Sequence, residues 1–234
     1  MLKICIKHPL IHIGIASLFL SACAGLTGTP QPDVPDQIKA AYHRALKTMQ
    51  AGKHQNAIQQ FKQIAKSQPG LAGPHTNLGM LYLKINLLEQ AQQSLQKAVE
   101  LNPNNTIAYN YLGIVYRNQG RFEEAIEAYE YAIAIDENFA SAHFNMGNSF
   151  MNLEKYDKAL EEFRKTIEIE GPSPEVYCCM GAAHENLQQY DLGLKYFQKS
   201  SKLDPLYDEA WFGAGSCLEK QEKWYQHFIF LIRQ

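Results

Sequence analysis

Asparagines recur at one spacing in this chain, where Asn118, Asn152 and Asn186 stand 34 residues apart. An asparagine side chain carries both a hydrogen-bond donor and an acceptor, so a row of them can pair with the backbone of an extended peptide. The patterns that serve catalysis, such as the nucleophile elbow, the P-loop, the dinucleotide fingerprint and zinc-ligand spacings, are missing from the sequence. We therefore expect a binding protein with no catalytic residues, no metal site and no cofactor.

The elements that must position these asparagines follow the same period. Five glycines keep it without a slip, namely Gly79, Gly113, Gly147, Gly181 and Gly215. A fixed period of this length is typical of helical-repeat solenoids, in which each unit buries its apolar face only by stacking on its neighbours. With the glycine as the eighth residue of each unit, the chain divides into units 38–71, 72–105, 106–139, 140–173 and 174–207, and an incomplete unit 208–234.

The unit 106–139 shows the expected pair of helices most clearly. Leu112, Gly113 and Tyr116 share one face of a first helix, and Gly120 is suited to end that helix because it tolerates a left-handed backbone. An apolar stripe from Phe122 onward then predicts a second helix. Small residues at positions 8 and 20 of the unit let the two helices approach closely. Position 20 is occupied by Ala57, Ala91, Ala125, Ala159 and Gly193.

This pattern resembles the tetratricopeptide repeat over residues 38 to about 231. The resemblance implies an all-α fold, a right-handed α-solenoid of about six helix-turn-helix repeats. In this family the first helices line a concave groove that binds a protein or peptide partner, chiefly through positions 2, 5, 6, 9, 12 and 13. Carried over residue by residue, the resemblance implies a groove that includes Asn77, Asn110, Arg117, Asn118, Phe144, Asn145, Asn148, Asn152, Glu175, Glu185, Asn186, Glu209 and Glu219.

Two interpretations of these groove residues stay open. The asparagines resemble the asparagine ladders of peptide-holding arrays, but asparagine before Leu-Gly is also common in the repeat itself. The glutamates of the second half favour a partner segment with basic residues. Glu175 and Glu209, however, also suit the N-termini of helices, where a negative charge is stabilised.

The first 23 residues differ from the rest of the chain. Lys3 and Lys7 precede an apolar run of 13 residues, Leu10 to Ala22. Such a run spans only about 20 Å as a helix, against a bilayer core of about 30 Å, so it predicts a secretory signal peptide. Its end, Leu20-Ser21-Ala22-Cys23, resembles the lipobox of bacterial lipoproteins. The resemblance implies that residues 1–22 are removed and that Cys23 carries palmitate or a similar acyl anchor. An ordinary signal peptide with an incidental cysteine is the alternative.

The residues after Cys23 predict where the anchored protein lies. Ala24, instead of an aspartate, follows the cysteine, and by resemblance to enterobacterial sorting rules this suggests the outer membrane, with the chain facing the periplasm. Residues 23–37 contain three prolines and are expected to form an extended tether. The mature chain would carry 20 basic and 24 acidic residues, a net charge of −4. This balance argues against a nucleic-acid partner and does not favour adsorption to anionic membranes.

The last unit departs from the pattern. His227 replaces the small residue at position 20, and the apolar segment FIFLIR follows it. An open apolar edge there could pair two copies or dock a partner, and a truncated or altered end is the other explanation. Cys178, Cys179 and Cys217 are expected to be small packing residues, with a Cys179–Cys217 bridge as the alternative.

The overall plan resembles envelope tetratricopeptide lipoproteins of the pilotin type. We therefore expect a lipid-anchored, non-catalytic adaptor that holds a protein or peptide partner of the bacterial envelope. Two other hypotheses stay open. The repeats could be the substrate-holding part of a larger transferase-type enzyme, or the chain could be a cytoplasmic scaffold.

Overall fold

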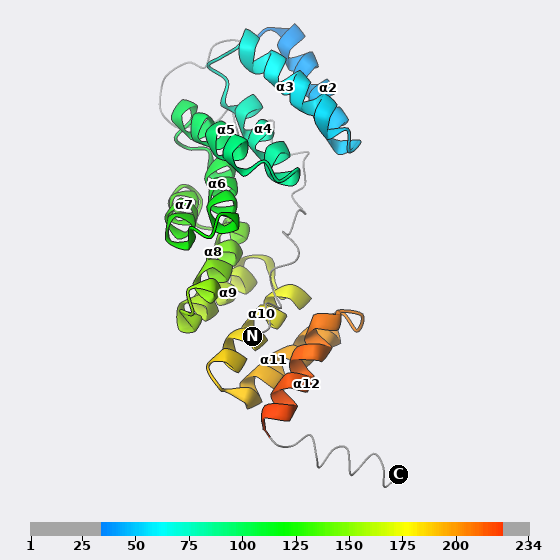
Figure 1. Cartoon of the computed structure of the whole chain (residues 1–234), viewed down its shortest axis with the longest axis vertical. Helices are drawn as coiled ribbons and strands as arrows, with labels where there is room; N and C mark the ends of the chain where they lie inside the picture. Colours follow the sequence, from blue (N-terminus) through cyan, green and yellow to red (C-terminus); the bar gives the residue numbers. More distant parts are fainter. Residues whose placement is uncertain (1–33, 222–234) are drawn as a thin grey trace. The chain divides into compact units, whose positions relative to one another are not determined.

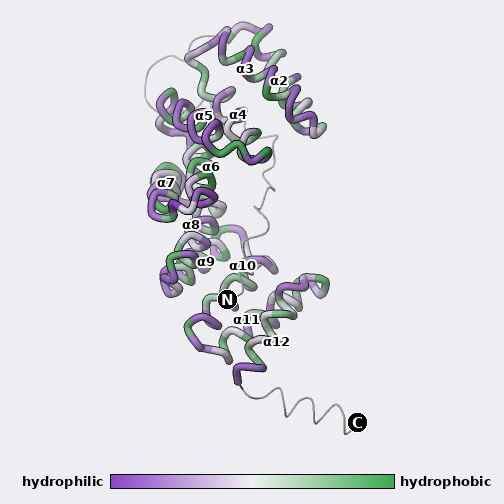
Figure 2. Tube along the Cα trace, in the orientation of Figure 1, coloured by the Kyte–Doolittle hydropathy of each residue, from purple (hydrophilic) through white to green (hydrophobic). Residues whose placement is uncertain are grey.

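The computed structural model describes residues 34–221, which form helices and the short turns between them (Figure 1). The expectations for the signal peptide, Cys23 and the apolar edge after residue 221 lie outside the described residues. Purple and green alternate along the helices in Figure 2, because each helix carries both a hydrophilic and a hydrophobic side. Residues 34–221 contain helices and no strand, so the all-α architecture expected from the sequence is confirmed.

The described residues form two compact units, which we call the N-terminal unit (34–137) and the C-terminal unit (138–221). The N-terminal unit contains α2 (Asp36–Gln50), α3 (His54–Ser67), α4 (Ala72–Lys84), α5 (Leu88–Leu101), α6 (Thr106–Asn118) and α7 (Phe122–Ile135). The C-terminal unit contains α8 (Ala140–Asn152), α9 (Tyr156–Glu170), α10 (Pro174–Asn186), α11 (Tyr190–Leu203) and α12 (Asp208–Lys220).

The recurring glycine lies where the two helices of a pair touch. A Cβ atom at Gly79 of α4 would stand 2.3 Å from Leu95 Cγ of α5. A Cβ atom at Gly113 of α6 would stand 2.4 Å from Tyr129 Cε1 of α7. Leu95 and Tyr129 are fully buried, so these glycines permit an approach that any larger residue would block.

A left-handed residue recurs in the turn between the two helices of each pair. Its φ values lie between 59° and 77°, at Gly52, Asn86, Gly120, Glu154 and Gln188. The expectation that Gly120 ends the first helix of its unit is confirmed, because α6 ends two residues earlier. Three of the five turns hold this conformation without glycine, at some cost in backbone strain.

Within each unit the first helices of successive pairs lie next to one another. In the N-terminal unit α4 contacts α6, and in the C-terminal unit α10 contacts both α8 and α12. Each second helix packs against the first helix that precedes it, and within a unit α3, α5, α9 and α11 also pack against the first helix that follows. We call the surface formed by adjacent first helices the first-helix face of each unit.

The cysteines of the C-terminal unit serve as packing residues. Cys178 and Cys217 share a buried cluster with Phe197, whereas Cys179 belongs to a separate cluster around Phe163. All three cysteines are buried thiols. The alternative of a Cys179–Cys217 bridge is therefore wrong for this structure, because the two side chains belong to different clusters.

Candidate peptide-binding faces

On the first-helix face of the N-terminal unit, Asn77 connects two repeats. Its Nδ2 atom donates to the hydroxyl of Tyr42 at 2.6 Å and to the Gly73 carbonyl at 2.9 Å. The first bond joins α4 to α2, and the second stays within α4. Gly73 leaves room for the tyrosine, because a Cβ atom there would stand 2.9 Å from the Tyr42 hydroxyl. Asn77 thus fixes the packing of neighbouring repeats from a buried position.

The remaining predicted residues of this face lie on α6 at different depths. Asn110 is buried, Arg117 is half-buried, and Asn118, the last residue of the helix, is exposed. Asn118 therefore presents its amide to the solvent, where a partner can reach it.

In the C-terminal unit, three predicted residues of α8 are buried. Phe144 packs on Phe163 of α9 with 5.8 Å between the ring centroids, within the cluster that also contains Cys179. Asn145 and Asn148 are buried beside it. The Cys179 thiol lies 3.7 Å from Asn148 Oδ1, as a weak donor to it from α10. These side chains hold α8 against its neighbours.

Asn152 and Asn186 use their amide nitrogens within their own helices. Asn152 Nδ2 donates to the Asn148 carbonyl at 2.7 Å, and Asn186 Nδ2 donates to the Ala182 carbonyl at 2.8 Å. Each bond reaches back one turn along its own helix, to the carbonyl four residues earlier. The 34-residue asparagine series therefore has a structural purpose at two of its three positions. The predicted groove as a whole stays a prediction.

The predicted acidic residues also differ from one another. Glu185 of α10 is buried, and its Oε1 atom accepts bonds from Ser216 Oγ at 2.6 Å and from Lys220 Nζ at 2.9 Å, both on α12. The hydrogen bond to Glu185 raises the pKa of Lys220. Glu175 and Glu209 lie in the first turns of α10 and α12, as expected for helix N-termini, and Glu219 is exposed. The charge of Glu185 is thus compensated inside the unit.

A buried hydrogen bond between a histidine of α8 and a glutamate of α9 was not predicted from the sequence. His143 Nδ1 lies 2.6 Å from Glu162 Oε2, and Lys165 Nζ lies 3.1 Å from Glu162 Oε1. Burial raises the pKa of Glu162, but the hydrogen bonds from His143 and Lys165 outweigh burial and leave the pKa below its ordinary value. Little in the sequence indicated this contact, because His143 and Glu162 stand 19 residues apart on different helices.

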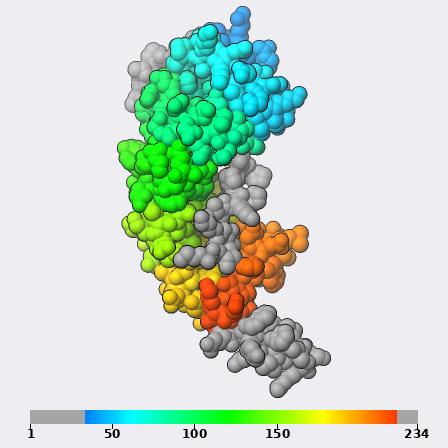
Figure 3. Space-filling model, in the orientation of Figure 1, coloured from blue at the N-terminus to red at the C-terminus, as the bar shows by residue number. Residues whose placement is uncertain are grey.

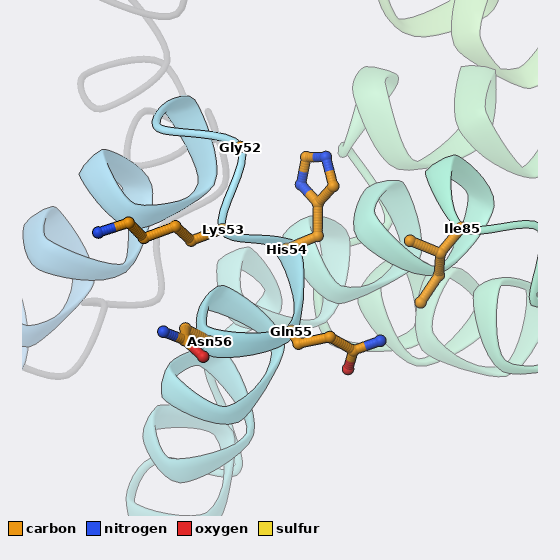
Figure 4. Close-up of a pocket in the computed structure, with 6 residues that line it drawn as sticks. All are labelled: Gly52, Lys53, His54, Gln55, Asn56 and Ile85. Carbon is orange, nitrogen blue, oxygen red and sulfur yellow. The ribbon is translucent and has the colours of Figure 1, made fainter.

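A surface hollow of about 430 Å³ lies at the turn between α2 and α3, and no residue of the asparagine series lines it (Figure 4). It is lined by Gly52, Lys53, His54, Gln55, Asn56 and Ile85. Within residues 34–221, no three histidine, cysteine, aspartate or glutamate side chains are grouped so that they could hold a metal ion. The same residues include no helix with the length and apolar character needed to span a bilayer.

Comparison with protein families accounts for the repeated geometry. Models described as tetratricopeptide repeat match residues 74–105, 94–127, 140–171 and 174–205, and a model described as TPR repeat matches residues 115–154. The chain is built of tetratricopeptide repeats. The TPR fold is a scaffold for protein–protein interactions, and this general role is the one that the matches support.

Solved structures similar to the chain include several TPR proteins. A crystal structure of MamA is 28% identical, with a TM-score of 0.64, and the match covers 72% of this chain and 92% of that one. YrrB, described as a TPR protein with an unusual peptide-binding site, is 25% identical, with a TM-score of 0.60 and coverages of 69% and 84%. TTC0263 from Thermus thermophilus is 19% identical, with a TM-score of 0.60 and coverages of 77% and 98%, and shows the fold alone. The comparison with curated proteins gave no match.

Proposed function

We propose that this chain is a non-catalytic adaptor that binds a segment of a protein partner, an extended peptide or a helix, on its first-helix faces. The observation that carries the proposal is the layer of adjacent first helices in each unit, with Asn118, Asn152 and Asn186 at their C-terminal ends. Asn118 and Asn186 are exposed, and Asn152 is half-buried. The peptide-binding site described for YrrB, which has the same fold, supports the proposal.

The C-terminal unit adds an apolar anchor and a charge preference to this face. Phe212 of α12 is 61% exposed, and an exposed aromatic ring is the kind of residue that contributes most to a protein interface. Glu219 is exposed near the end of the same helix. These residues favour a partner segment that combines an apolar side chain with basic ones.

We further propose that the adaptor is anchored by acylated Cys23 in the outer membrane and faces the periplasm, in the manner of the pilotin-type lipoproteins. This part rests on the lipobox-like sequence before Cys23. Growth of cells with radiolabelled palmitate tests it. The wild-type chain is expected to carry label and the Cys23→Ser variant none. An unlabelled wild-type protein that keeps its first 22 residues would contradict the anchor.

The binding proposal is tested with a partner identified by affinity purification on the full chain. The double variant Asn118→Ala with Asn152→Ala is expected to weaken binding of that partner by about tenfold, the loss of one or two hydrogen bonds. The control double variant, Gln59→Ala with Gln198→Ala, removes exposed amides from the second helices α3 and α11. Circular dichroism checks that both variants stay helical. Equal affinities for the two double variants would overturn the proposed face.

A further inference from the structure

The helical pairs of the N-terminal unit differ strongly in charge. Residues 34–71, which contain α2 and α3, carry six lysines and arginines against one acidic residue, a net charge of +5. Residues 72–105 carry two basic and two acidic residues and are neutral. Residues 106–137, which contain α6 and α7, carry two basic and six acidic residues, a net charge of −4. The unit is therefore basic at one end of its stack and acidic at the other.

The surplus at the basic end is exposed and uncompensated. Among its six lysines and arginines, Lys39 alone forms an ion pair in the described part of the chain, at 3.2 Å from the exposed Asp36. Lys62 lies over the ring of Tyr82, 5.7 Å from its centroid. The other four are exposed, namely Arg44, Lys47, Lys53 and Lys66.

These side chains spread over the whole α2–α3 hairpin. Lys39, His43 and Lys47 follow one another at intervals of four on α2, so they share one face of that helix, while Ala45 is buried on the other side. Lys53 lies in the turn before α3, and Lys66 lies in the last turn of α3. We call Lys39, Arg44, Lys47, Lys53 and Lys66 the basic surface; the α2–α3 hairpin that carries it forms the blue and cyan end of the N-terminal unit in Figure 3.

We propose that the basic surface docks on the anionic phospholipid headgroups of the membrane that holds the anchor. This inference rests on the proposed acylation of Cys23. The structural support is the uncompensated charge, since lysines and arginines near a membrane surface are attracted by anionic lipids. The chain supplies the proximity, because α2 begins thirteen residues after Cys23, at most about 45 Å of extended chain.

The acidic end of the same unit gives this contact a direction. Anionic headgroups attract the α2–α3 hairpin and repel the α6–α7 pair, so the unit meets the membrane with the hairpin first. The net charge of the whole mature chain, from which we expected no adsorption, averages over these two ends and describes neither of them.

Amine labelling measures the contact residue by residue. The full chain with Cys23→Ser, which cannot be acylated there, is treated with an acetylating reagent in the presence of phosphatidylglycerol-containing or pure phosphatidylcholine vesicles. Mass spectrometry is expected to show that anionic vesicles slow the acetylation of Lys39, Lys47 and Lys66 several-fold. Acetylation of the exposed Lys195 and Lys202 on α11 is expected to stay unchanged. Because the electrostatic attraction is screened, about 0.5 M salt removes the protection.

Charge variants provide the second arm. Arg44→Gln, Lys47→Gln and Lys66→Gln together are expected to weaken binding to anionic vesicles by about tenfold or more. The control set, Arg164→Gln, Lys195→Gln and Lys202→Gln, removes the same charge from exposed positions of the C-terminal unit and keeps the affinity.

Three outcomes would overturn the proposal. These are equal protection by neutral vesicles, equal loss of affinity in the two variant sets, and protection that rises with protein concentration without vesicles. The last would show that a second copy, through its acidic α6–α7 pair, covers the basic surface. The experiment does not depend on the anchor, which palmitate labelling tests separately.

Discussion

Gly113 and Tyr129 touch so closely that a Cβ atom at Gly113 would stand 2.4 Å from Tyr129 Cε1. The tyrosine ring is fully buried, so it cannot move aside unless α6 and α7 separate. The same relationship joins Gly147 to Phe163, at 2.6 Å. The repeated glycine therefore determines how closely the two helices of a repeat pack.

Gly113→Ala is expected to lower the free energy of unfolding by about 1–3 kcal/mol, because the added methyl group overpacks a closed contact. Gly70→Ala is the control, since within residues 34–221 nothing lies within 4 Å of a Cβ atom there and its φ is not left-handed. In the control alanine leaves stability unchanged or raises it by up to about 1 kcal/mol, because it restricts the unfolded chain more than glycine does. Urea unfolding followed by circular dichroism measures both. Equal stability of the two variants would contradict the packing role.

Gln188→Gly is expected to stabilise the protein by about 0.5–1 kcal/mol. Gln188 holds a φ of 60°, and this backbone conformation is more strained for a residue with a side chain than for glycine. Gln198→Gly, in the interior of α11, makes the same chemical change at a helical position. It is expected to destabilise by about 1 kcal/mol. Thermal unfolding compares the two, and a loss of stability in Gln188→Gly would show that the turn does not carry strain.

The contacts of Glu162 predict a dependence of stability on pH. The pKa of Glu162 is lowered in the folded chain below the ordinary value of 4.5, so these contacts stabilise the fold above that pH. This contribution is lost as the pH falls through the lowered pKa and the carboxylate takes up a proton. Urea unfolding between about pH 3 and pH 7 is expected to show a smaller loss on acidification in Glu162→Gln than in wild type. Glu161→Gln, at the exposed neighbouring residue, should keep the wild-type slope.

Cys217 is expected to resist alkylation in the folded protein. Burial, and after it the charge of Glu185, raises the pKa of its thiol to about 12. At pH 8 only about one thiol in ten thousand is then the reactive thiolate. Iodoacetamide followed by mass spectrometry should leave Cys217 unmodified until urea unfolds the chain. Modification at the same rate with and without urea would rule out a buried thiol.

The sequence predicted the helix pairs because their determinants are local. The small residue at Gly113, the apolar stripe after Phe122 and the left-handed position at Gly120 all act within one repeat. Such patterns specify which face of a helix is buried, and the same face recurs in every repeat.

The environment of the predicted groove residues could not be derived in this way. The partners of Asn77 and Glu185, which are Tyr42 and Lys220, both stand 35 residues away in a neighbouring repeat. Their pairing depends on how repeats stack, which a single period does not specify. Opposite charges about one period apart, such as Glu185 and Lys220, were nevertheless visible in the sequence. Asn186 differs again, because its amide bonds to its own helix.

The most direct test of the central claim, that the first-helix faces bind a protein partner, is photo-crosslinking in living cells. A photoreactive amino acid is placed at Asn118 or Asn186, exposed at the ends of first helices, and in separate variants at Glu127 or Glu161, exposed on second helices. We predict a cross-link to the same protein from Asn118 and Asn186 and none from Glu127 and Glu161. Cross-links from the second helices alone would contradict the claim.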